Sequence, residues 1–183
     1  MSKEPIPASA YDMDHAEEAE ERRTLAILVD NEPGVLGRVV GLFSARGYNI
    51  ESLTVAEVDR GKHRSRITIA TTGTAHMLEQ IEAQVLRLVP VAAVIDITKS
   101  KRGIERELAL VKVAGKGEPR VEALRIAEIF RARVIDTTNE SFIFEITGAS
   151  EKIDQFTDLM EPLGLVEVSR TGVLSIRRGK DAG

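Results

Sequence analysis

Apolar residues in the first half of the chain recur at two alternating spacings. Leu25, Ile27 and Val29 occupy every second position, which predicts a half-buried strand. The apolar residues that follow recur at helical spacing, and they are Val35, Leu36, Val39, Leu42 and Phe43. Gly47 stands where a left-handed residue would end this helix. The pattern therefore predicts a strand, a turn and a short helix over residues 24–47.

The same alternation continues through a second helix. An extended segment over residues 48–58 and a strand over residues 65–71 flank a predicted hairpin turn. Thr74 is a suitable N-cap for a helix that carries Met77, Leu78, Ile81, Val85 and Leu88. Pro90 ends that helix before a fourth strand. The predicted order is βαββαβ, the split unit of ferredoxin-like folds.

The second half of the chain repeats this order. A strand over residues 108–113 precedes a helix with Pro119 near its first position. A hairpin of two strands follows, and Ser150 is expected to cap the next helix. The last strand is predicted over residues 166–176, with a bulge at Gly172. The predicted fold is α+β, with two tandem ferredoxin-like βαββαβ units.

Composition sets the boundaries of the two units. Residues 1–22 are polar and contain two prolines, so we expect a disordered acidic tail. After it we expect a first unit at 23–99, a linker at 100–105, a second unit at 106–178 and a tail at 179–183. The seven acids and three bases of residues 1–23 account for the net charge of −4, since the remaining 22 acids and 22 bases cancel.

The predicted first sheet has two unlike faces. One face is apolar and can pack both helices; it carries Leu25, Ile27, Val29, Leu53, Val55, Ile67, Ile69, Ile95 and Ile97. The other face carries mostly small residues, namely Ala26, Leu28, Ser52, Thr54, Ala56, Thr68, Ala70 and Val94. A sheet covered by helices on one side tends to bury its other side against a partner. A symmetric homodimer is the simplest assembly that would do so.

Composition also excludes several classes of protein. The 183 residues are 43% hydrophobic but only 4% aromatic, which indicates an aliphatic core. No apolar run reaches the ~18–20 residues of a membrane span, and we expect no signal peptide at the acidic N-terminus. The absence of cysteine excludes disulfides and thiolate metal sites and fits a cytoplasmic protein. The neutral body offers little attraction to nucleic acid.

The turn before the first helix is the strongest candidate for a binding site. The six candidate residues are Asn31, Gly34, Val35, Leu36, Asn49 and Ile50. A helix start offers free backbone N–H groups, here those of residues 34–36, and favours a carboxylate. The two asparagine amides can accept hydrogen bonds from an ammonium, and the leucine and isoleucine can flank a short aliphatic group. The helix start and the second strand could thus share an α-amino acid, although an ordinary structural turn is the alternative.

Two segments resemble a known family. The sequence NEPGVLGRVVGLFSARGYNIESLTV, followed by SRITI, is similar to the small, regulatory subunit of acetolactate synthase. The resemblance extends from about residue 24 to residue 178. It implies that the first unit is an ACT domain and that the six candidate residues bind the feedback inhibitor valine between two ACT domains. Gly37 replaces a small hydroxyl or alanine of many relatives and would widen the pocket, so the choice among valine, isoleucine and leucine stays open.

The resemblance also implies a partner. In that family a catalytic large subunit condenses two pyruvates, or pyruvate and 2-oxobutyrate, with thiamine diphosphate, FAD and magnesium. We assign none of these cofactors, and no catalytic or metal-binding residue, to this chain. The expected function is to activate the large subunit and to make it sensitive to branched-chain amino acids.

Two other classes of function stay open. An enzyme on the same fold, such as an acylphosphatase-like hydrolase, would need a positioned arginine and asparagine around a phosphate loop, which we do not find. A stand-alone amino-acid-sensing ACT regulator could control another enzyme or transcription; in the latter case it would need a helix-turn-helix and a basic surface. His15, His63 and His76 share no spacing typical of metal ligands.

Overall fold

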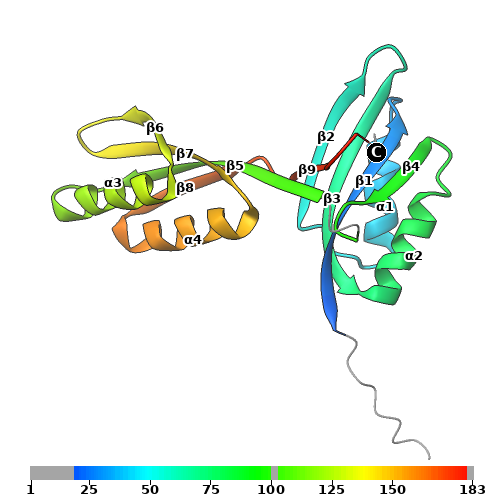
Figure 1. Cartoon of the computed structure of the whole chain (residues 1–183), viewed down its shortest axis with the longest axis horizontal. Helices are drawn as coiled ribbons and strands as arrows, with labels where there is room; N and C mark the ends of the chain where they lie inside the picture. The colour runs from blue at the N-terminus through cyan, green and yellow to red at the C-terminus, as the bar shows by residue number, and fades with distance from the viewer. Residues whose placement is uncertain (1–18, 100–102, 181–183) are drawn as a thin grey trace, which may run out of the picture.

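The computed structural model describes residues 19–99 and 103–180, which form two βαββαβ units (Figure 1). The expected tails at residues 1–18 and 181–183 and the linker residues 100–102 lie outside this described part. The elements of the first unit are β1 (Glu20–Asp30), α1 (Val35–Ala45), β2 (Ser52–Asp59), β3 (Arg64–Thr74), α2 (Ala75–Val85) and β4 (Val91–Asp96). Those of the second unit are β5 (Gly103–Ala114), α3 (Glu118–Phe130), β6 (Arg133–Thr137), β7 (Ser141–Gly148), α4 (Ser150–Met160), the 3₁₀ turn η1 (Glu161–Leu163), β8 (Leu165–Arg170) and β9 (Leu174–Arg177).

The two sheets have the same strand order. In the first unit the order is β2-β3-β1-β4, and in the second it is β6-β7-β5-β8, with antiparallel neighbours throughout. Two helices lie on one face of each sheet (Figure 1). Strand β9 pairs with the first part of β5, apart from this order. The predicted α+β fold with two tandem ferredoxin-like units is therefore confirmed.

The ends of the helices follow the local sequence signals, with one exception. The Thr74 hydroxyl accepts a hydrogen bond from Met77 N at 3.3 Å and caps α2, as predicted. Gly47 follows α1 with a φ of 70°. The prediction for Ser150 is wrong, because Ser150 is the first residue of α4 and its Oγ donates to Glu107 Oε2 at 3.1 Å. The buried carboxylate on β5 provides an acceptor that the local sequence does not reveal.

The first core is aliphatic and lies between the sheet and its two helices. Leu25 and Ile27 of β1 are fully buried in it. Ile27 pairs with Val94 across β1 and β4, and directly paired residues share a face of the sheet. Val94 therefore packs against the core while Ile95 points to the opposite face, the reverse of the prediction. The phase of β4 depends on its register with β1, which shifts between Leu28 and Val29.

The second core is built around aromatic rings. Phe144 of β7 and Phe156 of α4 are both 0% exposed, and their ring centroids lie 6.0 Å apart in an edge-to-face arrangement. Phe142 lies 5.5 Å from Phe144, and Phe130 of α3 lies 5.5 Å from Phe156. Such edge-to-face and tilted pairs stabilise a core beyond the area that they bury. The rings thus connect both helices to the second sheet.

Several strands differ from their predicted bounds. Residues 20–22, expected in the tail, begin β1 and pair with the end of β3. Residues 103–105, expected in the linker, begin β5 and pair with β9. Residues 166–176 do not form one bulged strand, because the chain leaves the sheet after β8 and returns as β9. Gly172, where the bulge was predicted, has a φ of 79° at this change of direction.

The helix-free face of the first sheet is partly covered by the C-terminal segment of the same chain (Figure 1). Val173 is only 2% exposed; its N–H donates to Ser52 Oγ at 2.7 Å, and its carbonyl accepts from Thr54 Oγ1 at 3.2 Å. Both hydroxyls belong to the face that we expected a partner to bury. Around β2, therefore, this chain itself supplies the cover, and the homodimer stays a prediction.

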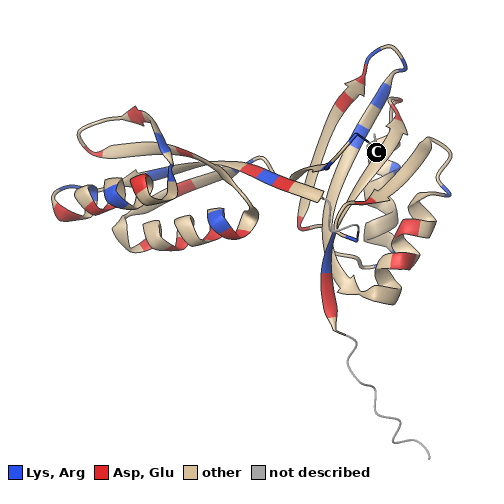
Figure 2. Cartoon of the chain, in the orientation of Figure 1, with Lys and Arg blue, Asp and Glu red and all other residues tan. Residues whose placement is uncertain are grey.

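Charged residues of both signs are interspersed along both units (Figure 2). In the described residues every α-helix is separated from the next by at least one strand, so these residues contain no helix-turn-helix. None of the helices in residues 19–99 and 103–180 is long and apolar enough to cross a membrane.

Candidate effector-binding site

Helix α1 starts with an unusual set of free groups. Gly34 precedes it with a φ of 85° and, lacking a side chain, cannot cap it. A Cβ added at Gly34 or at Gly37 would meet no atom of the described part of the chain within 4 Å, so these residues leave the space beside this backbone open. The first turn of α1 also carries no acidic residue. The positive end of the helix dipole is therefore left without a negative side chain of its own first turn.

At the start of each of the other three described α-helices, the chain itself supplies either a side-chain cap or a carboxylate. The side chain of Thr74 caps α2, while Glu118 and Glu151 place a carboxylate in the first turns of α3 and α4. Among the described α-helices, only α1 has neither a side-chain cap nor an acidic residue in its first turn. Because acids near a helix start are stabilising, their absence from α1 leaves a position that an external carboxylate can take.

The backbone donors differ in part from the prediction. Val35 N is used within the turn, since it donates to Glu32 O at 3.3 Å. The N–H groups of Gly34 and Leu36 have no hydrogen-bond partner in the described residues, and neither does that of Gly37. The available donors are therefore Gly34, Leu36 and Gly37, and the sequence reasoning missed the third. Counting four orphan N–H groups at a helix start could have found it.

The side chains of the six candidate residues have different surroundings. Val35 is 6% exposed and belongs to the first core, so only its backbone is near the surface. Leu36 is 38% exposed, and Ile50 is half-buried at the edge of the same core. Asn31 and Asn49 are exposed, and their side-chain amides make no hydrogen bond with the described residues. Both amides are thus available to a ligand.

Within one chain, however, the candidate residues form two separate groups. Asn31 N donates to His63 O at 2.7 Å, next to the pair formed by Asp30 and Arg64. Asn49 O accepts from Thr71 Oγ1 at 2.6 Å, and Thr71 pairs with Arg23 at the other end of β1. These two ends of β1 are about 23 Å apart at the usual rise of a strand. A single chain therefore does not let both asparagines contact one amino acid, and the expected site between two ACT domains stays a prediction.

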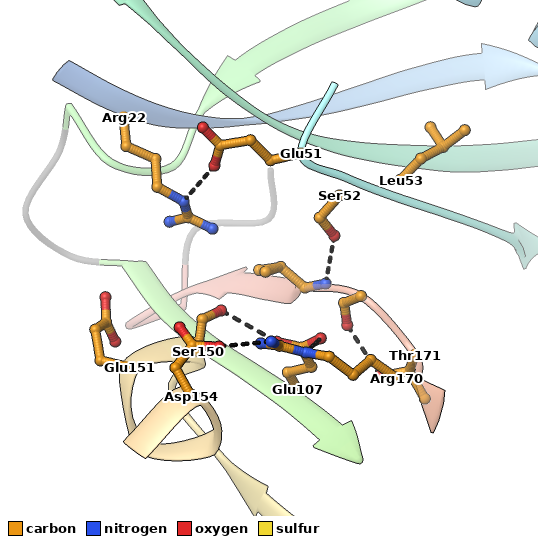
Figure 3. Close-up of a pocket in the computed structure, with 12 residues that line it drawn as sticks. Arg22, Glu51, Ser52, Leu53, Glu107, Ser150, Glu151, Asp154, Arg170 and Thr171 are labelled. Carbon is orange, nitrogen blue, oxygen red and sulfur yellow. Dashed lines mark hydrogen bonds and ion pairs between the residues drawn. The ribbon is translucent and has the colours of Figure 1, made fainter. Parts of the chain in front are cut away.

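A second feature that the sequence did not reveal is a cleft of about 520 Å³ between the two units (Figure 3). Its first wall carries Arg22 and Glu51 of the first unit, joined by an ion pair of 3.2 Å. Arg22 also reaches Glu105 of β5 at 3.1 Å and so connects the two units. Partial burial alone would lower the pKa of Arg22, but the hydrogen bonds to Glu105 and Glu51 outweigh it and raise that pKa.

The opposite wall of the cleft is a charged network within the second unit (Figure 3). Arg170 makes hydrogen bonds of 2.8 and 2.7 Å with the two carboxylate oxygens of Glu107 and one of 2.5 Å with Asp154. Burial alone would raise the pKa of Glu107, but the hydrogen bonds from Arg170 and Ser150 lower it. The network ties β8 to β5 and α4. Because its charges are already paired, it is suited to hold the structure rather than to bind a ligand.

Comparisons with known proteins agree with this architecture. Residues 25–93 match the family model described as the AHAS small subunit-like ACT domain, and residues 106–179 match that of the small subunit of acetolactate synthase. The acetolactate synthase small subunit of Haemophilus influenzae is 45% identical over 160 residues, which cover 87% of this chain and 97% of that protein. The isozyme 3 small subunit of Escherichia coli is 45% identical over 159 residues, or 86% of this chain and 96% of that one.

A solved structure extends the agreement to three dimensions. The crystal structure of the acetolactate synthase small subunit from Thermotoga maritima is 38% identical and has a TM-score of 0.78, covering 88% of this chain and 99% of that one. The fold and the match to the ACT domain model thus define a two-unit protein of the ACT-domain class. Within that class, the chain belongs to the family of acetolactate synthase small subunits.

Proposed function

We propose that this chain is the regulatory subunit of an acetolactate synthase. It activates the catalytic large subunit and makes it sensitive to feedback inhibition by a branched-chain amino acid, with valine as the first candidate. Membership of the small-subunit family supports the choice of partner. In this proposal, thiamine diphosphate, FAD and magnesium belong to the large subunit and none of them to this chain.

The vacant start of α1 is the observation that carries the proposal. Three free N–H groups and the helix dipole favour the carboxylate of an amino acid. The exposed amides of Asn31 and Asn49 supply oxygens for its ammonium. Leu36 and Ile50 are partly exposed apolar residues that suit a short aliphatic side chain. Together these groups match each part of a branched-chain amino acid.

The separation of the two groups of residues supports a site shared by two copies. A two-fold axis can place the α1 start of one copy against Asn49 and Ile50 of its partner, and the reverse pair forms by symmetry. Such a dimer holds two equivalent sites, each with contributions from both chains. The same arrangement explains how one amino acid could contact residues about 23 Å apart within a chain. The proposed homodimer is thus part of the effector site.

Mixed dimers test this arrangement directly. Asn31→Ala and Asn49→Ala should each weaken valine binding by roughly 1–3 kcal/mol, since each removes polar contacts with a charged group. A dimer of one Asn31→Ala chain and one Asn49→Ala chain, purified with two different tags, then has one doubly altered site and one unaltered site. Calorimetry should find wild-type affinity at half of the wild-type stoichiometry.

The alternative outcomes are distinct. If each site lay within one chain, the mixed dimer would bind weakly at both sites, like the two single variants. The wild-type homodimer and each single-variant homodimer serve as controls for stoichiometry. Wild-type affinity in both single variants would place the effector elsewhere.

Regulation requires that the effector distinguish two states of the complex. An effector that binds both states equally shifts nothing, and the usual allosteric coupling is ~1–3 kcal/mol. Micromolar to millimolar binding corresponds to about 4–8 kcal/mol, which is enough to supply that bias.

Co-purification with the large subunit from the same cell should give an enzyme more active than the large subunit alone. Valine, leucine and isoleucine added in turn should then identify the inhibitor.

A further inference from the structure

A two-stranded ribbon connects the two units. Strand β5 begins at Gly103, close after the first unit, and β9 pairs with it as the chain returns. Figure 1 shows β9 reaching the first sheet beside β2 and β3. We name residues 171–177 the C-terminal joint, because they run from the end of β8 to this contact. The orientation of the second unit thus depends on how the C-terminal joint sits on the first sheet.

The C-terminal joint is held on the first sheet by specific contacts. Val173 exchanges hydrogen bonds of 2.7 and 3.2 Å with Ser52 and Thr54 of β2. Arg66 of β3 donates to Ser175 O at 2.8 Å. Because Val173 is almost fully buried, its N–H and carbonyl need these partners. Close-up views of the cleft show Ser52 directed at the joint (Figure 3).

Gly172 is required by this close approach. Its φ of 79° is a conformation that side chains disfavour. A Cβ at this position would also lie 2.7 Å from Ser52 Oγ and 3.1 Å from Thr54 Cγ2. A larger residue would therefore push the C-terminal joint away from β2. The glycine predicted as a strand bulge in fact allows two units to meet.

The residues just before β2 carry half of the proposed effector site. Asn49 and Ile50 lie just before it, and the N–H of Glu51, which separates Ile50 from Ser52, donates to Ala70 O at 2.9 Å. The carbonyl of Asn49 is held by Thr71 at 2.6 Å. Residues 49–54 therefore lie along β3, with a bend at Glu51 before β2 begins. A shift of this segment at Asn49 is transmitted to Ser52 and so to the C-terminal joint.

The far end of the C-terminal joint is anchored in the second unit. Arg170 directly precedes it and is tied to Glu107 of β5 and Asp154 of α4. Thr171 N donates to Leu108 O at 3.0 Å. Since little chain separates these anchors from Val173, movement of Val173 is passed to the second unit.

The contact between the C-terminal joint and the first sheet also includes unfavourable interactions. Arg66 and Arg177 lie close enough to repel, and burial together with Arg177 lowers the pKa of Arg66. The buried Nε atoms of both arginines have no hydrogen-bond partner among residues 19–99 and 103–180. Buried donors without partners are destabilising. The contact thus combines specific hydrogen bonds with local repulsion, so a modest change at β2 can alter it.

We propose that the C-terminal joint transmits effector occupancy from β2 to the second unit. Ser52, Thr54 and Gly172 act as positioning residues, which set the orientation of the second unit according to the state of Asn49 and Ile50. This inference rests on the proposed function, because it requires an effector at the start of β2. It adds the route by which binding in the first unit reaches the rest of the complex.

The test separates effector binding from its consequence. Gly172→Val should displace the C-terminal joint without changing any residue of the proposed effector site. In the reconstituted complex with the large subunit, calorimetry should still detect valine binding. Inhibition should be lost, with the coupling between valine and activity reduced about fivefold or more, the lower end of usual allosteric effects. Gly117→Ala is the matched control, since Gly117 also has a positive φ (67°) but a Cβ there meets nothing.

A second variant and a direct readout cover the case in which Gly172→Val fails to fold. Ser52→Ala with Thr54→Val keeps the glycine and removes both side-chain hydrogen bonds. Because the chain contains no cysteine, spin labels can be placed at Gln80→Cys on α2 and Glu128→Cys on α3. Valine should change the distance between these labels in the otherwise unaltered protein, and the joint variants should abolish that change.

The outcomes distinguish the two proposals. Wild-type protein that binds none of valine, leucine and isoleucine would overturn the proposed function. Joint variants that bind valine and still show full inhibition and the full change in label distance would overturn the role of the C-terminal joint alone.

Discussion

The two units share a strand order but differ at the helix after their first strand. A glycine with positive φ precedes each helix, Gly34 before α1 and Gly117 before α3. Glu118 then places a carboxylate in the first turn of α3, whereas α1 has none. One helix start therefore has an internal anion and the other is open to an external one. In the proposed function, the repeated fold therefore keeps a binding site in one of its two copies.

The helix-free faces of the two sheets differ as well. The C-terminal joint covers part of the first face through Val173. On the second face, Leu110 and Ile143 line a hollow of about 200 Å³ together with Lys112, Glu167 and Ser169. The first unit is thus the one that receives contacts from the rest of the chain, and the second is the one that projects away from them (Figure 1).

The largest expected effect concerns the aromatic core of the second unit. Phe144→Ala should destabilise that unit by about 3–5 kcal/mol, because it leaves a cavity beside Phe142 and Phe156. Urea unfolding followed by circular dichroism measures the loss. Valine binding by the first unit should persist at low denaturant. Phe43→Ala is the matched change in the first core, where Phe43 is 0% exposed and should be needed for binding. Equal loss of binding in both variants would show that the units do not act separately.

The vacant start of α1 can be filled by substitution. Gly34→Asp should weaken valine binding by about 10- to 150-fold, because its carboxylate occupies the position of the ligand's own and repels it. Gly34→Asn is the control of similar shape, since asparagine tolerates positive φ and carries no charge. Gly117→Asp makes the same change in the second unit and should leave binding unchanged. Undiminished inhibition by valine in Gly34→Asp would refute the assignment.

The charged network of the second unit predicts a dependence on pH. Burial alone would raise the pKa of Glu107, but its hydrogen bonds with Arg170 and Ser150 lower it below its ordinary value. A carboxyl with a lower pKa in the folded state stabilises the protein above its unfolded pKa and loses that effect as pH falls through the folded pKa. Stability should therefore decline as pH falls below 4.5.

Substitution isolates the contribution of this carboxylate. Glu107→Gln should lower stability at neutral pH by about 1–3 kcal/mol, because Arg170 loses a charged partner. The difference between the variant and the wild type should shrink in acid. A constant difference from pH 7 to pH 3 would show that the charge of Glu107 contributes nothing.

The smallest effect is expected at the start of α3. Glu118→Gln should cost about 0.3–1 kcal/mol of stability at low ionic strength, because it removes the carboxylate from the helix start. Denaturant unfolding in low and in 1 M salt measures it, and screening should remove most of the difference. A cost that persists in high salt would mean that α3 depends on another property of Glu118.

Much of the architecture could be predicted from local patterns. The alternation around Ile27, the cap at Thr74 and the end of α1 at Gly47 depend on neighbours in the chain, so the sequence reveals them. The facing of Val94 and Ile95 could not be predicted, because it depends on the shifted register of β4 against β1. The role of Ser150 could not be predicted either. Its hydroxyl donates to Glu107, which lies 43 residues away in the chain, so the local sequence suggests a helix cap instead.

The candidate site divides in the same way. The free donors at Gly34 and Leu36 follow from the position of a helix start, which the sequence reveals. The place of Asn31 and Asn49 at opposite ends of the sheet could not be predicted locally, because it depends on strand direction.

By itself, the sequence determined the two ferredoxin-like units, the uncapped start of α1 and the resemblance to the acetolactate synthase small subunits. Only the tertiary structure decided that the C-terminal joint rests on β2 and that the six candidate residues form two distant groups. The physical reason is that periodicity and capping act over a few residues, whereas strand register and the docking of Val173 on Ser52 depend on segments far apart in the chain.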